Sequence, residues 1–330
     1  MNKKVRIVLD TMGYENELSH AIKAAIDFKT THQDVEIVLV GNEEEIKPLL
    51  NNHQFEIIHT TTFIDQKDTV ISARRKTESS MHKGLNYLKE NSDVDGMLTA
   101  GNTAVFVYNA YSIIGLLDHI KKPAFMPFVP TMDQVGMNIL DVGASIQVDG
   151  EDLFNFAIMA NAIAKNRVEN PKIGILNIGT EEHKGFSYHH EAHKLLLNSS
   201  LNYKGFIEPK NIVEREVDVL VTDGFAGNIA LKTMEGVALS LGNFLKKEYK
   251  KKRYFLAGLF SLPIFKKVKK IFDYRNNAGA FVLGTKKILV KTHGSADYLQ
   301  FMSALRMLYE SVQNNVLETI TKDLEQHYGK

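Results

Sequence analysis

The sequence predicts an α/β protein with a Rossmann-like, layered sheet and two closely packed lobes. Short apolar runs alternate with helix-length amphipathic stretches throughout the 330 residues, which is typical of crossover helices between strands. Some runs, such as 36–40, are apolar at nearly every position, which favours a parallel sheet covered on both faces. We find no repeat and no Pro/Gly-rich linker, so the lobes are not expected to be separable modules.

The elements follow in order from these patterns. Apolar runs predict strands at 5–10, 35–40, 55–59, 96–100, 137–141, 172–178, 218–223 and 288–292. Helical spacing of apolar residues predicts helices at 16–28, 79–90, 103–116, 152–165, 187–198, 227–249 and from 297 to about 326.

Composition excludes several functional classes. There is no cysteine, which excludes disulfides, a thiolate nucleophile and a Cys-ligated zinc site. The net charge is +1, so no global field favours nucleic acid. The first strand follows the N-terminus without the longer apolar stretch of a signal peptide, and we expect a cytoplasmic protein.

Three glycine-containing turns follow predicted strands, at 99–103, 177–185 and 222–228. In open α/β sheets, ligands bind beyond the carboxyl ends of strands, and helix N-termini attract anions. Together the turns indicate an anionic substrate, although each alone is equally typical of an ordinary turn.

Other signatures are missing. The sequence has no phosphate-binding loop of the G-x-x-x-x-G-K-[ST] type, no G-x-G-x-x-G fingerprint and no G-x-S-x-G nucleophile elbow. His189 and His193 share one face of a predicted helix, but the order is not H-E-x-x-H, and a solvated helix face explains them better than a metal pair. We expect neither metal nor cofactor.

The ordered set of motifs resembles the phosphate acyltransferase family of bacterial phospholipid synthesis (PlsX). The motifs cover nearly the whole chain, at 10–13, 74–81, 100–103, 140–144, 156–159, 176–185, 223–236 and 291–295. Four positions depart from the family pattern: Tyr14 and Glu15 replace Gly-Asp, Ser145 replaces Asn, and Ala104 replaces Gly. These changes leave local ligand geometry in doubt more than the reaction class.

The resemblance implies a fold like that of isocitrate and isopropylmalate dehydrogenases, acyl carrier protein thioesters and inorganic phosphate as substrates, and a homodimer that touches the membrane peripherally. Phosphate is itself a nucleophile, so the enzyme must position it and stabilise the developing oxyanion. We expect Lys184, Asn228 and His293 to be catalytic, with His293 protonating the leaving thiolate. The remaining candidates for phosphate and substrate binding are Ser79, Ser80, Gly101, Asn102, Thr103, Asn177, Gly179, Asp223 and Gly227.

Each assignment has a structural alternative. Lys184 fits a solvated loop charge, Asn177 and Asn228 fit turn caps, and His293 fits a group that satisfies the backbone. Ser79 and Ser80 also fit a helix N-cap. The basic residues 74–76 fit phosphate, the acidic carrier protein or a solvated helix start.

A basic and apolar segment at 246–270 interrupts the α/β pattern. Two lysine-rich stretches bracket the apolar residues 254–265, which are too few for a spanning helix of roughly 20 residues. We expect Phe255, Leu256, Leu259 and Phe260 to enter the membrane surface while lysines meet anionic headgroups. A hairpin at a dimer interface is the alternative.

Two other functions remain open at the level of sequence. A dehydrogenase on the same fold predicts nicotinamide binding and clustered metal-binding aspartates, and we find neither an adenine-ribose signature nor such a cluster. A membrane-attached scaffold for lipid enzymes tolerates loss of Lys184 and Asn228, whereas an acyltransferase does not. Fold alone decides neither.

Overall fold

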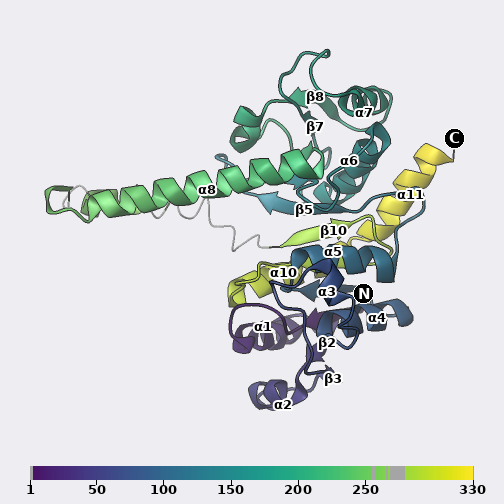
Figure 1. The fold of residues 1–330 in the computed structure, drawn as a ribbon, viewed down its shortest axis with the longest axis vertical. Coiled ribbons are helices and arrows are strands. Elements are labelled where there is room, and N and C mark those ends of the chain that lie inside the picture. The colour runs from purple at the N-terminus through teal and green to yellow at the C-terminus, as the bar shows by residue number, and fades with distance from the viewer. Residues whose placement is uncertain (1–2, 255–257, 265–266, 268–278, 330) are drawn as a thin grey trace.

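One mixed sheet forms the centre of the computed structural model, which describes residues 3–254, 258–264, 267 and 279–329 (Figure 1). Across the described residues the sheet has 11 strands in the order β3-β2-β1-β4-β11-β10-β5-β6-β9-β7-β8. The strands are β1 Val5–Asp10, β2 Val35–Gly41, β3 Glu56–His59, β4 Gly96–Thr99, β5 Ala124–Val129, β6 Met137–Leu140, β7 Ile173–Leu176, β8 Tyr203–Ile207, β9 Val219–Val221, β10 Ala280–Leu283 and β11 Ile288–Lys291.

Strand direction divides this sheet into two halves. In the first half, β3, β2, β1, β4 and β11 are parallel neighbours. In the second half, β6, β9, β7 and β8 are parallel neighbours. The antiparallel pairs β11–β10, β10–β5 and β5–β6 join the halves, so the second half runs opposite to the first. β4 therefore runs in the opposite direction to β7 and β9, and the turn after β4 follows a strand of the opposite direction to those before the other two turns.

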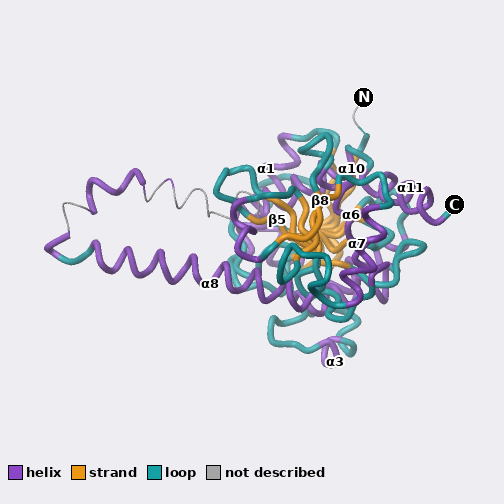
Figure 2. The backbone as a smooth tube through the Cα atoms, turned by 90° about the horizontal axis from the view of Figure 1, so that it is seen from above, coloured by secondary structure: helices purple, strands orange, loops and turns teal. Residues whose placement is uncertain are grey.

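Helices cover both faces of the sheet, as expected for a layered α/β fold (Figures 1 and 2). Alternating side chains of β1 show the two faces: Ile7 and Leu9 belong to the core that includes α1 and α10, whereas Val8 packs in the core of α4 and α5. The helices are α1 Leu18–Thr31, α2 Glu43–Ile46, α3 Val70–Ala73, α4 Ser80–Glu90, α5 Thr103–Asn109, α6 Gly150–Ala164, α7 Ser187–Leu197, α8 Gly224–Tyr249, α10 Tyr298–Gln313 and α11 Val316–Tyr328. Short 3-10 helices lie at Lys47–Leu49, Pro209–Glu214 and Lys252–Tyr254.

All eight predicted strands are present, with ends shifted by at most a few residues, and the layered α/β class is confirmed. The prediction omitted β5, β8 and β10. β5 contains Pro127, which lacks a backbone donor and usually argues against an interior strand. β8 contains Gly205 at a φ of +92°, and its register with β7 is irregular.

Two predicted helices are divided. The predicted helix 103–116 is α5 followed by a π-helical turn at Ala110–Ile114, which Gly115 ends with a φ of +81°. The predicted helix from 297 onward is α10 and α11, separated at Asn314 and Asn315. Asn315 has a φ of +50°, a left-handed conformation that asparagine adopts more readily than most residues.

The long helix α8 leaves the body of the molecule and projects away from the sheet in both views (Figures 1 and 2). Its only buried residues are Gly224 and Gly227, in its first turn. Beyond that turn it carries exposed apolar side chains, among them Val237, Leu241 and Phe244. Within the part of the chain that the structure describes, no helix combines the length and apolar character needed to cross a bilayer.

Candidate active site

The first polar region, which we call the β9 region, comprises residues 141–145, 177–185 and 223–228 after β6, β7 and β9. Its centre is the buried carboxylate of Asp141, which accepts hydrogen bonds from the backbone N–H groups of Phe125, Gly143, Ala144 and Ser145. Burial raises the pKa of Asp141 to about 6, and these four amides lower it. The carboxylate thus fixes the 141–145 loop.

The start of α8 packs directly on that loop. A Cβ at Gly227 would overlap the carbonyl oxygen of Asp141, and one at Gly224 would lie 2.5 Å from the Asp141 carboxylate. Glycine is therefore required at both positions, because the backbone of α8 lies too close to Asp141 for a side chain. The close packing gives Gly227 a structural role, and its predicted role in phosphate binding stays a prediction.

The N-terminal amides of α8 are already engaged. Asp223 is the N-cap, and its Oδ1 accepts from the N–H groups of Phe225 and Ala226. Gly224 N–H donates to the carbonyl of Ser145, and Gly227 N–H donates to the carbonyl of Asp223 at 3.0 Å. These amides begin the helix in this structure, and the side chain of Asn228 is exposed beside Gly143.

Lys184 lies on a loop that Asn177 shapes. The Nδ2 of Asn177 donates to the Lys184 carbonyl at 2.9 Å, and its Oδ1 accepts from Ile178 N–H at 2.9 Å. Gly179 leaves room for the Lys184 side chain, because a Cβ there would lie 2.5 Å from its Cδ. The Lys184 ammonium is paired with Glu181 Oε1 at 2.8 Å. Asn177 therefore holds the Lys184 backbone in place, and the Glu181 carboxylate balances the charge of its ammonium.

The second polar region, which we call the β11 region, comprises residues 10–15, 79–80, 99–103 and 291–295 after β1, β4 and β11. Asp10 is fully buried and accepts hydrogen bonds from Thr99 Oγ1 at 2.9 Å and Met12 N–H at 3.2 Å. Burial raises the pKa of Asp10 to about 6, and hydrogen bonds from Ser80 and Thr99 lower it. Gly101 N–H donates to Thr99 Oγ1, which extends this network to the predicted turn.

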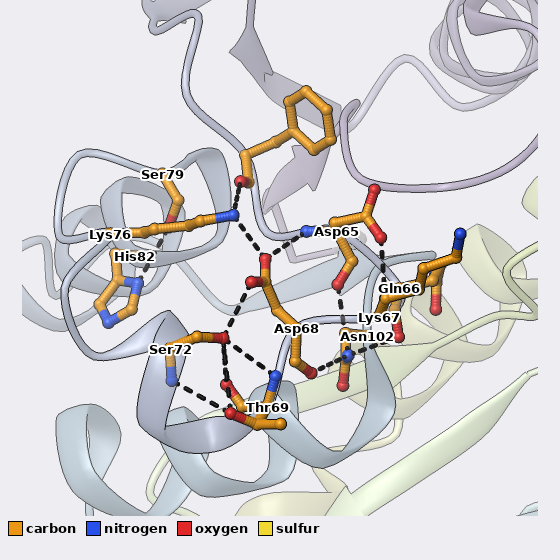
Figure 3. A network of polar contacts seen from close by, with 11 residues as sticks. Asp65, Gln66, Lys67, Asp68, Thr69, Ser72, Lys76, Ser79, His82 and Asn102 are labelled. Atoms are coloured by element: carbon orange, nitrogen blue, oxygen red, sulfur yellow. Dashed lines mark hydrogen bonds and ion pairs between the residues drawn. The ribbon is translucent and has the colours of Figure 1, made fainter.

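Asn102 organises a loop that lies over the β11 region (Figure 3). Its Nδ2 contacts the backbone carbonyls of Asp65, Gln66 and Asp68 at 2.9 to 3.3 Å. Its Oδ1 accepts from Val105 N–H and caps α5, the helix that Thr103 opens. Both ends of the Asn102 amide are thus occupied within the protein.

The two predicted serines differ in their contacts. Ser79 is the N-cap residue of α4, but its hydroxyl contacts His82 Nδ1 at 2.9 Å and makes no capping bond (Figure 3). Ser80 is buried and hydrogen-bonds to Asp10. The structure therefore places both serines inside the β11 region.

His293 lies beyond the end of β11. Its Nδ1 accepts from Ser295 N–H at 3.3 Å, so the neutral ring carries its proton on Nε2. Burial lowers the pKa of His293, and the nearby ammonium groups of Lys291 and Lys232 lower it further. A lowered pKa favours the neutral imidazole, whose Nε2–H remains available as a donor.

Helix α8 connects the two regions. Asn228, Lys232 and Glu235 are spaced i, i+4 and i+7 and thus follow one face of α8. Lys232 and Glu235 act electrostatically on His293, which places this stretch of α8 beside the β11 region. One helical turn, roughly 6 Å, separates Asn228 from Lys232. Asn228 and the surroundings of His293 therefore lie along α8, whereas Lys184 lies on the loop after β7 with Asn177 and Glu181.

Sequence reasoning missed Lys291 and Lys232. Lys291 is the last residue of β11 and is only 7% exposed. The available signal was strand alternation, because Lys291 follows buried Leu289 by two positions and shares its face. His189 and His193 contact Phe186 N–H and the Tyr203 hydroxyl, and no group of three or more potential metal ligands occurs among the described residues.

Solved structures share this fold. A phosphotransacetylase from Streptococcus pyogenes matches with a TM-score of 0.65 at 18% identity, covering 94% of each chain. A 4-hydroxythreonine-4-phosphate dehydrogenase from Burkholderia phymatum matches with a TM-score of 0.52 at 11% identity, covering 94% of this chain and 98% of that one. At such identities the matches define the fold class alone, a layered α/β fold.

Sequence relatives identify the family. A family model described as "Fatty acid synthesis protein" matches residues 5–319. The phosphate acyltransferase of Ureaplasma parvum serovar 3 (strain ATCC 27815) is 66% identical over 99% of this chain and 100% of its own. That of Mycoplasma pneumoniae is 39% identical over 98% of both. The chain therefore belongs to the phosphate acyltransferase family, and it is an enzyme of fatty acid and phospholipid synthesis.

Proposed function

We propose that the enzyme transfers a fatty acyl group from an acyl carrier protein thioester to inorganic phosphate, giving an acyl phosphate for phospholipid synthesis. The full-length similarity to phosphate acyltransferases carries this proposal. The position of Asn228 on α8, the helix whose Lys232 and Glu235 act on His293, supports it.

In this reaction a phosphate oxygen attacks the thioester carbonyl carbon, and the C–S bond breaks as the acyl C–O bond to phosphate forms. The thiolate leaves and takes up a proton. We assign Lys184 and Asn228 to the negative charge that develops on the reacting oxygens, since positioned donors at that charge lower the barrier. His293, with Nε2–H, is our candidate donor to the leaving sulfur.

The test is to incubate the purified protein with acyl carrier thioester and phosphate and to trap acyl phosphate with hydroxylamine. We expect product with the wild-type protein and a loss of at least about 100-fold for Lys184→Ala or Asn228→Ala. Lys194→Ala, an exposed lysine of α7, is the matched control and should remain active. A wild-type protein that forms no acyl phosphate, or variants that remain fully active, would contradict the proposal.

We propose next that the protein is cytoplasmic and contacts the membrane peripherally through the segment beyond α8. In the described residues, Leu259 is 53% and Phe260 81% exposed, and Lys246, Lys250 and Lys251 are exposed nearby. Apolar side chains flanked by lysines suit a surface of anionic lipid. Phe255 and Leu256, also expected to insert, lie outside the described residues.

Vesicle flotation with anionic lipid tests this contact. We expect the wild-type protein to float with vesicles and Phe260→Glu to remain in the soluble fraction. If the variant floats as well as the wild-type protein, the segment is assigned to a protein interface instead.

We also propose that α8 takes part in a homodimer. Val237, Leu239, Leu241 and Phe244 are each more than half exposed, an arrangement that a second copy of α8 would bury. Light scattering of the wild-type protein should give the mass of two chains, and Leu241→Glu should shift it towards one. A monomeric wild-type protein at micromolar concentration would oppose this assignment.

A further inference from the structure

The ammonium of Lys291 is buried with little to balance its charge. Its Nζ donates one hydrogen bond, to the backbone carbonyl of Thr292 at 2.6 Å. An ammonium has three donors. Among the described residues, no carboxylate lies within ion-pair distance of Lys291. Burying such a group costs free energy, so a lysine at this position requires an explanation other than packing.

The sheet places Lys291 among the polar groups of the β11 region. Lys291 is paired in register with Thr99, and Thr99 is hydrogen-bonded to Asp10. The three side chains thus follow one row across the carboxyl ends of β11, β4 and β1. Asp10 is occupied by its own donors, Thr99, Ser80 and Met12 N–H, and is not the partner of Lys291.

Groups from three other segments surround the lysine. Lys232 of α8 lowers the pKa of Lys291, and Glu15 of the loop after β1 raises it. Lys232 is paired with Glu235 at 2.8 Å, and the backbone N–H of Glu15 donates to the Gly294 carbonyl at 2.7 Å. The hydroxyl of the adjacent Thr292 is buried and has no partner among the described residues. Two ammonium groups, the carboxylates of Glu15 and Glu235 and the buried Thr292 hydroxyl therefore gather where α8 passes the end of β11.

We propose that Lys291 is an anion-binding residue of this active site and that its ammonium holds an oxygen of inorganic phosphate. This inference rests on the proposed function, because it assigns a further residue to the same reaction. An ammonium binds phosphate as a point charge. Lys184 is already paired with Glu181, whereas Lys291 has no such competitor.

The burial of Lys291 supports a functional role. Burial lowers its pKa to about 8, so the folded protein keeps the ammonium at the expense of stability. Residues that lower stability, such as a buried charge without an ion pair, are concentrated at functional sites. A bound phosphate dianion supplies the missing countercharge.

The experiment compares neutral variants of two lysines at opposite ends of one strand. Lys291→Met retains the length and apolar stem, and Lys291→Gln serves as a second neutral variant. Lys287→Met is the matched control, because Lys287 is partly buried just before β11 and donates to the carbonyls of Asn91 and Val94. Phosphate binding is measured by calorimetry on the full chain, and KM for phosphate is measured in the acyl transfer assay.

We expect both Lys291 variants to bind phosphate at least about tenfold more weakly, a loss typical of one charge-assisted contact. KM for phosphate should rise by a similar factor, while Lys287→Met stays within about twofold of the wild type. Phosphate affinity or KM retained by either Lys291 variant overturns the inference, as does a wild-type protein that binds no phosphate. A wild-type protein that binds phosphate through Lys291 but makes no acyl phosphate would refute the proposed function alone.

Discussion

The β9 and β11 regions are both polar, but they differ in how far the protein satisfies their groups. In the β9 region, Asp141 takes four amides, Asp223 caps α8, and Lys184 is paired with Glu181. In the β11 region, Lys291 has one backbone acceptor and, among the described residues, no carboxylate within ion-pair distance. Buried polar groups are normally paired, so unpaired ones point to a ligand. We infer that the β9 region is a scaffold whose polar groups are paired within the protein, and that the β11 region binds an anion.

The largest expected effect is loss of the Asp141 carboxylate. Asp141→Ala leaves four backbone amides without this acceptor, one of them buried and three in partly buried contacts, and should lower the free energy of unfolding by about 4 kcal/mol. Urea denaturation measures this change. Asp118→Ala, at an exposed position, is the control and should change stability little. Equal stability of the two variants would mean that the β9 region is not the scaffold inferred here.

The second prediction concerns a substitution that should raise the free energy of unfolding. Replacing Lys291 by Met removes a buried ammonium and should raise the free energy of unfolding by up to about 3 kcal/mol near pH 7. The folded pKa is about 8, against 10.5 for the unfolded chain, so the unfolded state binds more protons between these values. Wild-type stability should therefore rise with pH through this window relative to the variant.

Urea denaturation of both proteins at several pH values between 7 and 10.5 tests this difference. Lys232, Glu15 and His293 face Lys291 and remain in both proteins, so their titration largely cancels. Below pH 8 the penalty is complete and constant, because both states are protonated. A variant that is less stable than wild type at pH 7 would show that Lys291 is a structural residue.

The third prediction concerns two glycines in α8. Gly227→Ala forces a methyl group against the Asp141 carbonyl and should cost about 2 kcal/mol. Gly242→Ala meets no atom within 4 Å and should stabilise α8 by about 0.5–1 kcal/mol. Thermal unfolding of both variants checks the contrast. If both are stabilised, the close packing of α8 on the 141–145 loop is wrong.

Sequence patterns were sufficient for the fold class and for the positions of the site turns. Apolar periodicity located β4, β7 and β9, and glycines marked the turns that follow them. The pattern could not give strand direction across the sheet, because the reversal depends on β5 and β10. Pro127 concealed β5, and β10 was not recognised as a strand.

The candidate site was only partly predictable for the same reason. A lysine at the end of an apolar strand is usually solvated, and Lys291 is buried only because β11 lies between β10 and β4. Conversely, Asn102 and Gly227 have the residue types of ligand-binding turns, yet they form contacts within the protein. The residue types indicated where the polar turns lie. Strand order and hydrogen-bond partners decide which polar groups remain free to bind a substrate.

The smallest expected effect tests whether Glu181 restrains Lys184. Glu181→Gln removes the carboxylate that pairs with Lys184 but leaves Asn177 holding the loop backbone. Because the pair is exposed, thermal stability should be unchanged, and KM for phosphate should fall by no more than about fivefold. Glu182→Gln, the neighbouring exposed carboxylate, is the control. A rise in KM for Glu181→Gln alone would show that Glu181 positions Lys184 for phosphate and does not compete with it.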